Sequence, residues 1–158
     1  MSELINILKR LQPCIKGKWF IGDGALLGIH REGDLLKHDK DIDIYLLEGS
    51  QIDRNLLKKN NLKLEKYYLN EYGRRGRIQL GQITYGQNKI IHQHTEHNID
   101  IFYLKRYKNH WTIQNWEGVT KYLDDDIKDL EPIIFHDIPC FIPNYFRRDE
   151  ILRRQYGS

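Results

Sequence analysis

The sequence has few of the features that mark secreted or membrane-bound proteins. Its two cysteines, Cys14 and Cys140, are too few for a dense disulfide framework and form no C-x-x-C metal motif. There is no segment resembling a signal peptide and no apolar run long enough to span a bilayer. These absences predict a reduced, cytoplasmic protein without a transmembrane segment, and peripheral association with the inner membrane is compatible with them.

A strong excess of charge of one sign is also missing. The 25 Lys and Arg residues barely outnumber the 22 Asp and Glu residues, so the formal charge of +3 does not indicate a nucleic-acid partner. By contrast, hydrophobic residues make up 40% of the chain, which is enough to build a core and excludes intrinsic disorder. A length of 158 residues predicts a single domain spanning residues 1–158.

Hydrophobic periodicity predicts a mixture of helices and strands. Helical patterns cover residues 2–12, 25–31, 51–59 and 145–156. Extended patterns cover residues 18–21, 41–47, 63–69, 77–85, 89–94, 98–104, 133–135 and 138–142. This order of elements predicts an α+β fold in which one mixed sheet is flanked by helices.

Three aspartates on two of the predicted strands suggest a metal site. Asp41 and Asp43 lie two residues apart on a strand, so their side chains point to the same face. Neighbouring carboxylates disfavour each other's ionisation, and a divalent cation removes this penalty. Asp100 is expected to be the third ligand or the base that accepts a hydroxyl proton. We therefore predict a Mg²⁺ site, with Mn²⁺ as the alternative ion, although an isolated D-x-D pair often simply faces solvent.

A glycine-rich turn precedes these carboxylates. Gly22 and Gly24 would let a phosphate approach backbone N–H groups at the start of the helix that follows. Gly28 could serve the same purpose, but close helix packing explains it equally well. Arg31 and Lys40 follow closely and could neutralise donor phosphates.

Three parts of the sequence resemble the LicD/fukutin-related family. The run GALLGIHREGDLLKHDKDID, from Gly24 to Asp43, matches without a gap a signature of roughly G-T-L-L-G-x-x-R-x-G-x-x-I-P-W/H-D-x-D-I-D. The segment NIDIF at 98–102 and the stretch 143–157 are similar to later family segments. Ala25 departs from the usual Thr, and Lys40 interrupts the aspartate run.

The resemblance implies a nucleotidyltransferase-like fold and a Mg²⁺-dependent transferase of cell-surface polysaccharide or lipopolysaccharide modification. Such an enzyme moves a phospho-substituent, such as phosphocholine or ribitol phosphate, from a CDP-linked or other NTP-derived donor to a glycan or lipid-linked glycan hydroxyl. Carried over to this sequence, Asp41, Asp43 and Asp100 are the catalytic and metal-binding carboxylates. The residues expected to bind the donor nucleotide and its phosphates are Gly24, Ala25, Gly28, Arg31, Asp39 and Lys40.

Two other functions stay open at this point. The chain could transfer a nucleoside monophosphate to a small-molecule hydroxyl, as antibiotic-modifying nucleotidyltransferases do, or it could bind nucleotide without turnover. The cluster of His92, His94 and His97 lacks a fourth ligand for a transition metal, so we expect no metal there, and a role in binding donor or acceptor is the alternative.

We expect two charged clusters in the final third of the sequence to have structural roles. The aspartates of the final third are expected in an exposed loop or at a helix start: Asp124, Asp125, Asp126 and Asp129. The arginines of the last predicted helix are expected to face water, with contact to an anionic surface as the alternative: Arg147, Arg148, Arg153 and Arg154.

Overall fold

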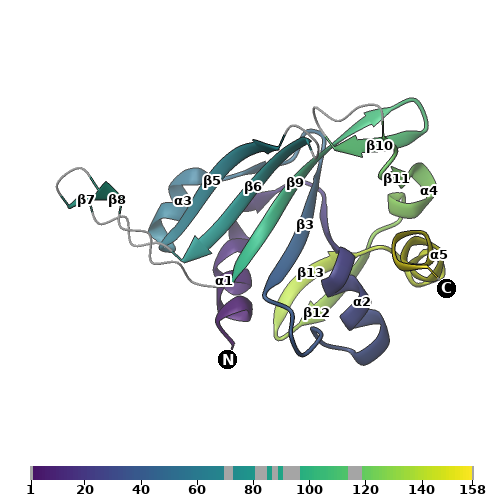
Figure 1. Cartoon of the computed structure of the whole chain (residues 1–158), viewed down its shortest axis with the longest axis horizontal. Helices are drawn as coiled ribbons and strands as arrows, with labels where there is room; N and C mark the ends of the chain where they lie inside the picture. Colours follow the sequence, from purple (N-terminus) through teal and green to yellow (C-terminus); the bar gives the residue numbers. More distant parts are fainter. Residues whose placement is uncertain are drawn as a thin grey trace.

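The computed structural model describes residues 2–69, 73–80, 85–86, 89–90, 97–113 and 119–157. As predicted, the fold is α+β, with a curled mixed sheet flanked by helices (Figure 1). The helices are α1 (Glu3–Leu11), α2 (Asp23–Glu32), α3 (Arg54–Lys59), α4 (Asp124–Ile127) and α5 (Tyr145–Tyr156), and a 3-10 turn covers Gln12–Cys14.

The main sheet is built around one long strand. It contains β2 (Trp19–Gly22), β3 (Asp41–Leu47), β5 (Leu62–Leu69), β6 (Gly73–Leu80), β9 (Asn98–Tyr107), β10 (His110–Ile113) and β11 (Tyr122–Leu123). The order β11-β10-β9-β3-β2 is extended by β6, which pairs with β9, and by β5, which pairs with β6. Only the pair β3 and β9 is parallel among the described pairings of this sheet.

Three short strand pairs complete the described part of the chain. They are β1 (Ile15–Lys16) with β4 (Gln51–Ile52), β7 (Tyr85–Gly86) with β8 (Lys89–Ile90), and β12 (Glu131–Phe135) with β13 (Ile138–Ile142). Figure 1 shows α2, α5 and the β12–β13 hairpin on the side of β3 that lies away from β5 and β6. This arrangement brings the C-terminal third next to the edge where β2 leads into α2.

Helix α1 illustrates how the core forms. Ser2 caps its N-terminus by accepting a hydrogen bond from the Ile5 N–H at 3.2 Å. Leu4, Ile7 and Leu8 repeat at helical spacing and are buried. The helix contacts β5, β6 and β9, so its apolar face covers part of the sheet.

Two predicted elements differ from the structure. The helix expected over 51–59 is strand β4 followed by α3, because Asp53 caps the later start by accepting a hydrogen bond from the Leu56 N–H at 3.1 Å. The strand expected from residue 77 begins earlier, as β6 (Gly73–Leu80), because it pairs with β5 from Leu69 opposite Gly73 onward, and residues 81–84 of this prediction lie outside the described residues. Residues 91–96, which include His92 and His94, lie outside the described residues.

The helices of the described ranges are too short or too polar to cross a membrane.

Candidate active site

Three neighbouring strands bring the predicted aspartates to one place on the sheet. The antiparallel pairing of β2 and β3 puts Gly22 opposite Asp43, and the parallel pairing of β3 and β9 puts Asp43 opposite Asp100. Residues opposite each other in a sheet share a face, and Asp41 shares it too because it lies two residues before Asp43. On the far side of β9, Arg77 is in register with Asp100.

The three carboxylates differ in their access to solvent. Asp100 is buried, with 2% of its surface exposed, whereas Asp43 is half-buried and Asp41 is exposed. The Asn98 side-chain amide donates a hydrogen bond to Asp100 Oδ1 at 3.1 Å. The site is therefore closed around Asp100 and open toward Asp41.

These carboxylates offer the hard oxygen ligands that Mg²⁺ prefers, but they do not by themselves form a closed cage. Within the described ranges, no three His, Cys, Asp or Glu side chains stand in an arrangement that could hold a metal ion. In phosphoryl-transfer enzymes Mg²⁺ usually takes one or two carboxylates and completes its octahedron with water and substrate phosphates. The donor set fits a cation whose coordination a bound phosphate completes.

Asp39 contributes a carboxylate oxygen that also fits such a cation. Its Oδ2 atom is buried and has no hydrogen-bond partner, and burial raises the pKa of this carboxyl, against the lowering effect of the Leu36 backbone. A buried unpaired oxygen is costly unless a ligand or proton satisfies it. The same oxygen would lie 3.5 Å from a Cβ atom added at Gly24, so it faces the glycine turn.

The glycine turn joins β2 to α2 and lies beside the carboxylates. A Cβ atom at Gly22 would lie 2.8 Å from the Tyr45 ring and 2.9 Å from the Tyr122 hydroxyl oxygen, so only glycine fits there. A Cβ atom at Gly24 would meet nothing closer than Asp39 and the Tyr156 hydroxyl oxygen at 4.0 Å. Gly24 therefore lines the open part of the site.

Asp23, in the middle of this turn, was not predicted as a site residue. Its backbone is left-handed, with φ of 54°, a conformation that Asp tolerates better than most residues. The Tyr45 hydroxyl donates a hydrogen bond to Asp23 Oδ2, and the Lys121 ammonium lies 3.5 Å from Oδ1. Local backbone strain is typical of functional sites, but it is not visible in a sequence.

A cluster of aromatic rings packs next to the glycine turn. Tyr45 stacks between Phe20, at a centroid distance of 5.3 Å, and Phe102, at 4.9 Å, and meets the edge of Tyr122 at 5.2 Å. Burial is the main cause that raises the pKa of both Tyr45 and Tyr122 well above the usual value. Both phenols are therefore protonated at neutral pH; the Tyr45 hydroxyl donates to Asp23, and the Tyr122 hydroxyl accepts from the Gln155 amide.

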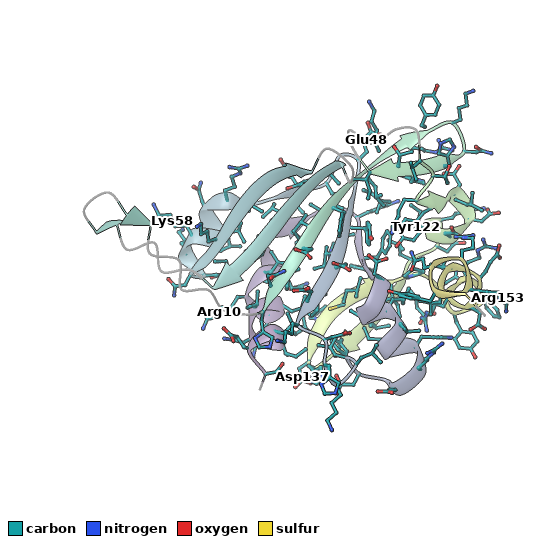
Figure 2. The ribbon with its side chains drawn as sticks, viewed as in Figure 1. Arg10, Glu48, Lys58, Tyr122, Asp137 and Arg153 are labelled. Atoms are coloured by element: carbon teal, nitrogen blue, oxygen red, sulfur yellow. The ribbon has the colours of Figure 1, made fainter. Side chains whose placement is uncertain are left out.

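Helix α5 brings a third tyrosine to the site. Burial, followed by the nearby carboxylates Asp23, Asp43 and Asp39, raises the pKa of Tyr156 to about 12. Figure 2 shows Tyr122 in the region between β3 and α5, and the Gln155 amide lies 3.3 Å from its hydroxyl oxygen. The last turn of α5 thus closes one side of the site.

The charged clusters of the C-terminal third hold α5 in place, which corrects two predictions. Asp124 does start a helix, as expected, but Asp126 is only 1% exposed and binds both Arg147, at 2.6 Å, and Arg154. Arg148 is also buried, where it donates to the Pro143 carbonyl at 2.7 Å and pairs with Glu131. Arg153 and Arg154 are exposed, as expected, whereas Arg147 is partly buried and Arg148 is buried. A helix pattern alone does not reveal a buried partner.

Three residues predicted to bind the donor have other contacts in the structure. Gly28 packs against the following loop, since a Cβ atom there would lie 2.5 Å from the Asp34 carbonyl oxygen. Ala25 is buried in the core. Arg31 is exposed and lines a cavity of about 150 Å³ together with Arg153. Eight residues of helix separate it from Asp23, a rise of roughly 12 Å.

Lys40 lies at the open edge of the site. Its side chain is exposed, and its carbonyl oxygen accepts a hydrogen bond from the Asn98 N–H at 3.2 Å. This bond continues the pairing of β3 and β9 by one residue beyond Asp41. Lys40 therefore borders the carboxylates through its backbone.

A family comparison agrees with the geometry. The model of the family described as "LicD/FKTN/FKRP, nucleotidyltransferase domain" matches residues 16–145, most of the chain. No curated protein matches the sequence. The matched residues include the glycine turn, β3, β9 and Lys121, while nearly all of α5 lies outside them.

Proposed function

Because the chain belongs to the LicD/FKTN/FKRP nucleotidyltransferase family, we propose that it is a Mg²⁺-dependent transferase that moves a phospho-alcohol from a CDP-linked donor to a glycan hydroxyl. Family membership supports the coarser role, a phosphotransferase type of activity in glycan modification. The donor, the cation and the transferred group are the parts that require experiment.

One observation carries this proposal: Asp43 and Asp100 stand opposite each other on parallel strands, directly beside the turn that begins at Gly22. A pair of carboxylates next to a glycine turn at the start of a helix can hold a cation and a phosphate side by side. In this proposal Asp43 and Asp100 hold a Mg²⁺ ion whose coordination a donor phosphate completes, with Asp41 at the open edge of the site. Asp39 offers its unpaired oxygen to the same cation, and Gly24 lines the donor phosphates.

In the proposed reaction, the acceptor hydroxyl oxygen forms a bond to the phosphorus that carries the alcohol. The bond between this phosphorus and the bridging oxygen breaks, and CMP leaves with the electron pair. The hydroxyl proton passes to water on the open side of the site, near exposed Asp41, since a loose transition state needs little help from a base. Bound Mg²⁺ supplies charge stabilisation to the phosphate oxygens.

Asp100 is better suited to fix a ligand than to act as a base. It is almost fully buried and is hydrogen-bonded by Asn98, so an acceptor arriving from solvent would not meet it first. A carboxylate held in this way keeps its oxygens in a defined direction.

Calorimetric titration tests the donor assignment. We expect CDP to bind in the presence of Mg²⁺ and to bind much more weakly after chelation, because the cation bridges carboxylates and phosphates. CTP serves as the comparison ligand. Failure of both nucleotides to bind would refute the proposed donor class.

The reaction products separate this proposal from its two alternatives. With CDP-choline or CDP-ribitol as donor and a glycan acceptor, phospho-alcohol transfer releases CMP. Transfer of the nucleoside monophosphate would instead release the phospho-alcohol and add a cytidylyl group, the mass of CMP less one water, to the acceptor. A module that only binds nucleotide would release neither product.

A further inference from the structure

We propose that Lys121 binds a phosphate of the donor at the glycine turn, a role that rests on the proposed function. The sequence suggested Arg31 and Lys40 as the cations for this task. The structure brings a further ammonium group to the turn from a distant part of the chain, since Lys121 Nζ lies 3.5 Å from Asp23 Oδ1.

The backbone of Lys121 is held at the edge of the sheet. Its N–H donates to the Trp111 carbonyl at 2.8 Å, and the next residue, Tyr122, pairs with Trp111 where β11 meets β10. The position from which the lysine side chain starts is therefore fixed by sheet pairing.

Two buried aromatic rings direct the rest of the side chain. The ammonium lies 5.6 Å from the ring centroid of Tyr45 and 5.9 Å from that of Tyr122. Such cation–π contacts orient a lysine while leaving its N–H donors available. Only 26% of the side chain is exposed, so the charge is directed toward the turn and away from bulk water.

The surrounding charges explain why a cation is needed there. Besides burial, the Asp23 and Asp43 carboxylates both raise the pKa of Tyr122, the ring beside the Lys121 ammonium. An anionic diphosphate approaching these carboxylates meets like charge, which a lysine ammonium offsets. The ion pair with Asp23 is long, at 3.5 Å, so a phosphate oxygen can compete for the ammonium.

Space for a ligand is available beside the lysine. Lys121 lines an open cavity of about 420 Å³ together with Thr120, Leu123, Arg154 and Gln155. A donor whose phosphate contacts Lys121 therefore has room next to this side chain.

The test compares the wild-type protein with Lys121→Met, Lys121→Arg and the control Lys128→Met, which changes an exposed lysine at the end of α4. The ligands are CDP, inorganic pyrophosphate and cytidine, each titrated calorimetrically with Mg²⁺. We expect Lys121→Met to weaken CDP and pyrophosphate binding by about tenfold or more, because a charge-assisted hydrogen bond is lost. Lys121→Arg should retain most of the affinity, and Lys128→Met should change nothing.

Cytidine separates a phosphate contact from a structural role. Its affinity should be the same in the wild type and in Lys121→Met, whereas general loosening of the site would weaken all three ligands together. The proposal is overturned if Lys121→Met binds CDP and pyrophosphate as the wild type does, or if it weakens cytidine equally.

The same titrations distinguish failure of the inference from failure of the proposed function. If the wild type binds pyrophosphate in a Lys121-dependent way but discriminates against CDP, the cytidine donor is refuted and the lysine role stands. If the wild type binds CDP and Lys121→Met binds it equally well, the donor stands and the lysine role is refuted. If the wild type binds no phosphate ligand, both are refuted.

Discussion

The two sides of the candidate site come from regions of very different character. The acidic side consists of the turn at Gly22–Gly24 together with β3 and β9, and most of it lies within one continuous motif. The opposite side consists of Lys121, Tyr122 and Tyr156, which come from the last third of the chain. The motif supplies the carboxylates of the site, whereas tertiary packing supplies the Lys121 ammonium and the tyrosine hydroxyl groups.

This difference has a structural basis. Sheet register alone fixes the acidic side, because Asp43 and Asp100 are direct neighbours. The opposite side depends on the pairing of β11 with β10 and on how α5 is anchored, and the anchor is buried Asp126 with its two arginine partners. Substitutions on the acidic side should therefore change the reaction directly, whereas the opposite side also depends on contacts that stabilise the fold.

The largest effect is expected from Asp43→Asn and Asp100→Asn. Each change keeps the shape of the side chain and removes a charge from the cation site, so turnover should fall by roughly 10³-fold or more with little loss of folding. CMP release measures the rate, and thermal unfolding by circular dichroism measures the fold. Asp125→Asn on α4 is the exposed control. Near-normal turnover in both site variants would remove the acidic side from the mechanism.

Removing the anchor of α5 should have the next largest effect. Asp126→Ala deprives Arg147 and Arg154 of their buried partner, which should lower the free energy of unfolding by about 2–3 kcal/mol. Urea unfolding measures this, and Asp125→Ala should stay within about 0.5 kcal/mol of the wild type. Equal, small changes in both variants would show that Asp126 does not anchor the helix.

A smaller effect is expected from Tyr156→Phe. The Tyr156 hydroxyl lies beside Gly24 and is protonated, since its pKa is raised to about 12. If it donates to a donor phosphate, its loss should reduce kcat/KM by about tenfold while stability is retained. Tyr145→Phe, on the same helix and 60% exposed, should have wild-type kinetics. Identical kinetics in the two variants would exclude Tyr156 from the site.

The smallest effect concerns alkaline pH. Burial is the main cause that raises the pKa of Tyr45 and Tyr122 above 10 in the folded state. As pH rises above 10, these two phenols therefore lose their protons in the unfolded chain before they do in the folded protein. Stability should thus be unaffected by these groups below about pH 9 and should decrease as pH rises above 10. Melting temperatures from pH 8 to 11 test this. A Tyr122→Phe variant should show a shallower decrease, and an unchanged slope would contradict the assignment.

The elements that the sequence predicted well are those with strong local patterns. The structure has β3 at Asp41–Leu47 and α5 at Tyr145–Tyr156, the same bounds as predicted, because alternation and helical spacing are clear there. Strands β10 and β11 were not predicted, since strands of four and two residues carry little alternation and depend on pairing with neighbouring strands. The sheet edge that holds Lys121 was missed for this reason.

The same distinction applies to individual site residues. The spacing of Asp41 and Asp43 predicted their shared face, which β3 provides. The contact between Lys121 and Asp23 joins residues that are far apart in the sequence. The left-handed backbone of Asp23 depends on its tertiary surroundings. Arg31 followed the motif in sequence, but helical rise carries it roughly 12 Å from the turn. Position in the sequence therefore predicts well which residues of a strand lie at the site. It predicts poorly how close to the site a residue lies when it follows along a helix that leads away.

Binding of Mn²⁺, followed by electron paramagnetic resonance in the presence of CDP, is the most direct test of the central claim that Asp43 and Asp100 help to hold a divalent cation. The account predicts saturable Mn²⁺ binding by the wild type that is stronger with CDP than without it and is lost in Asp43→Asn and Asp100→Asn. Undiminished binding in both variants, or no binding by the wild type with CDP present, would contradict it.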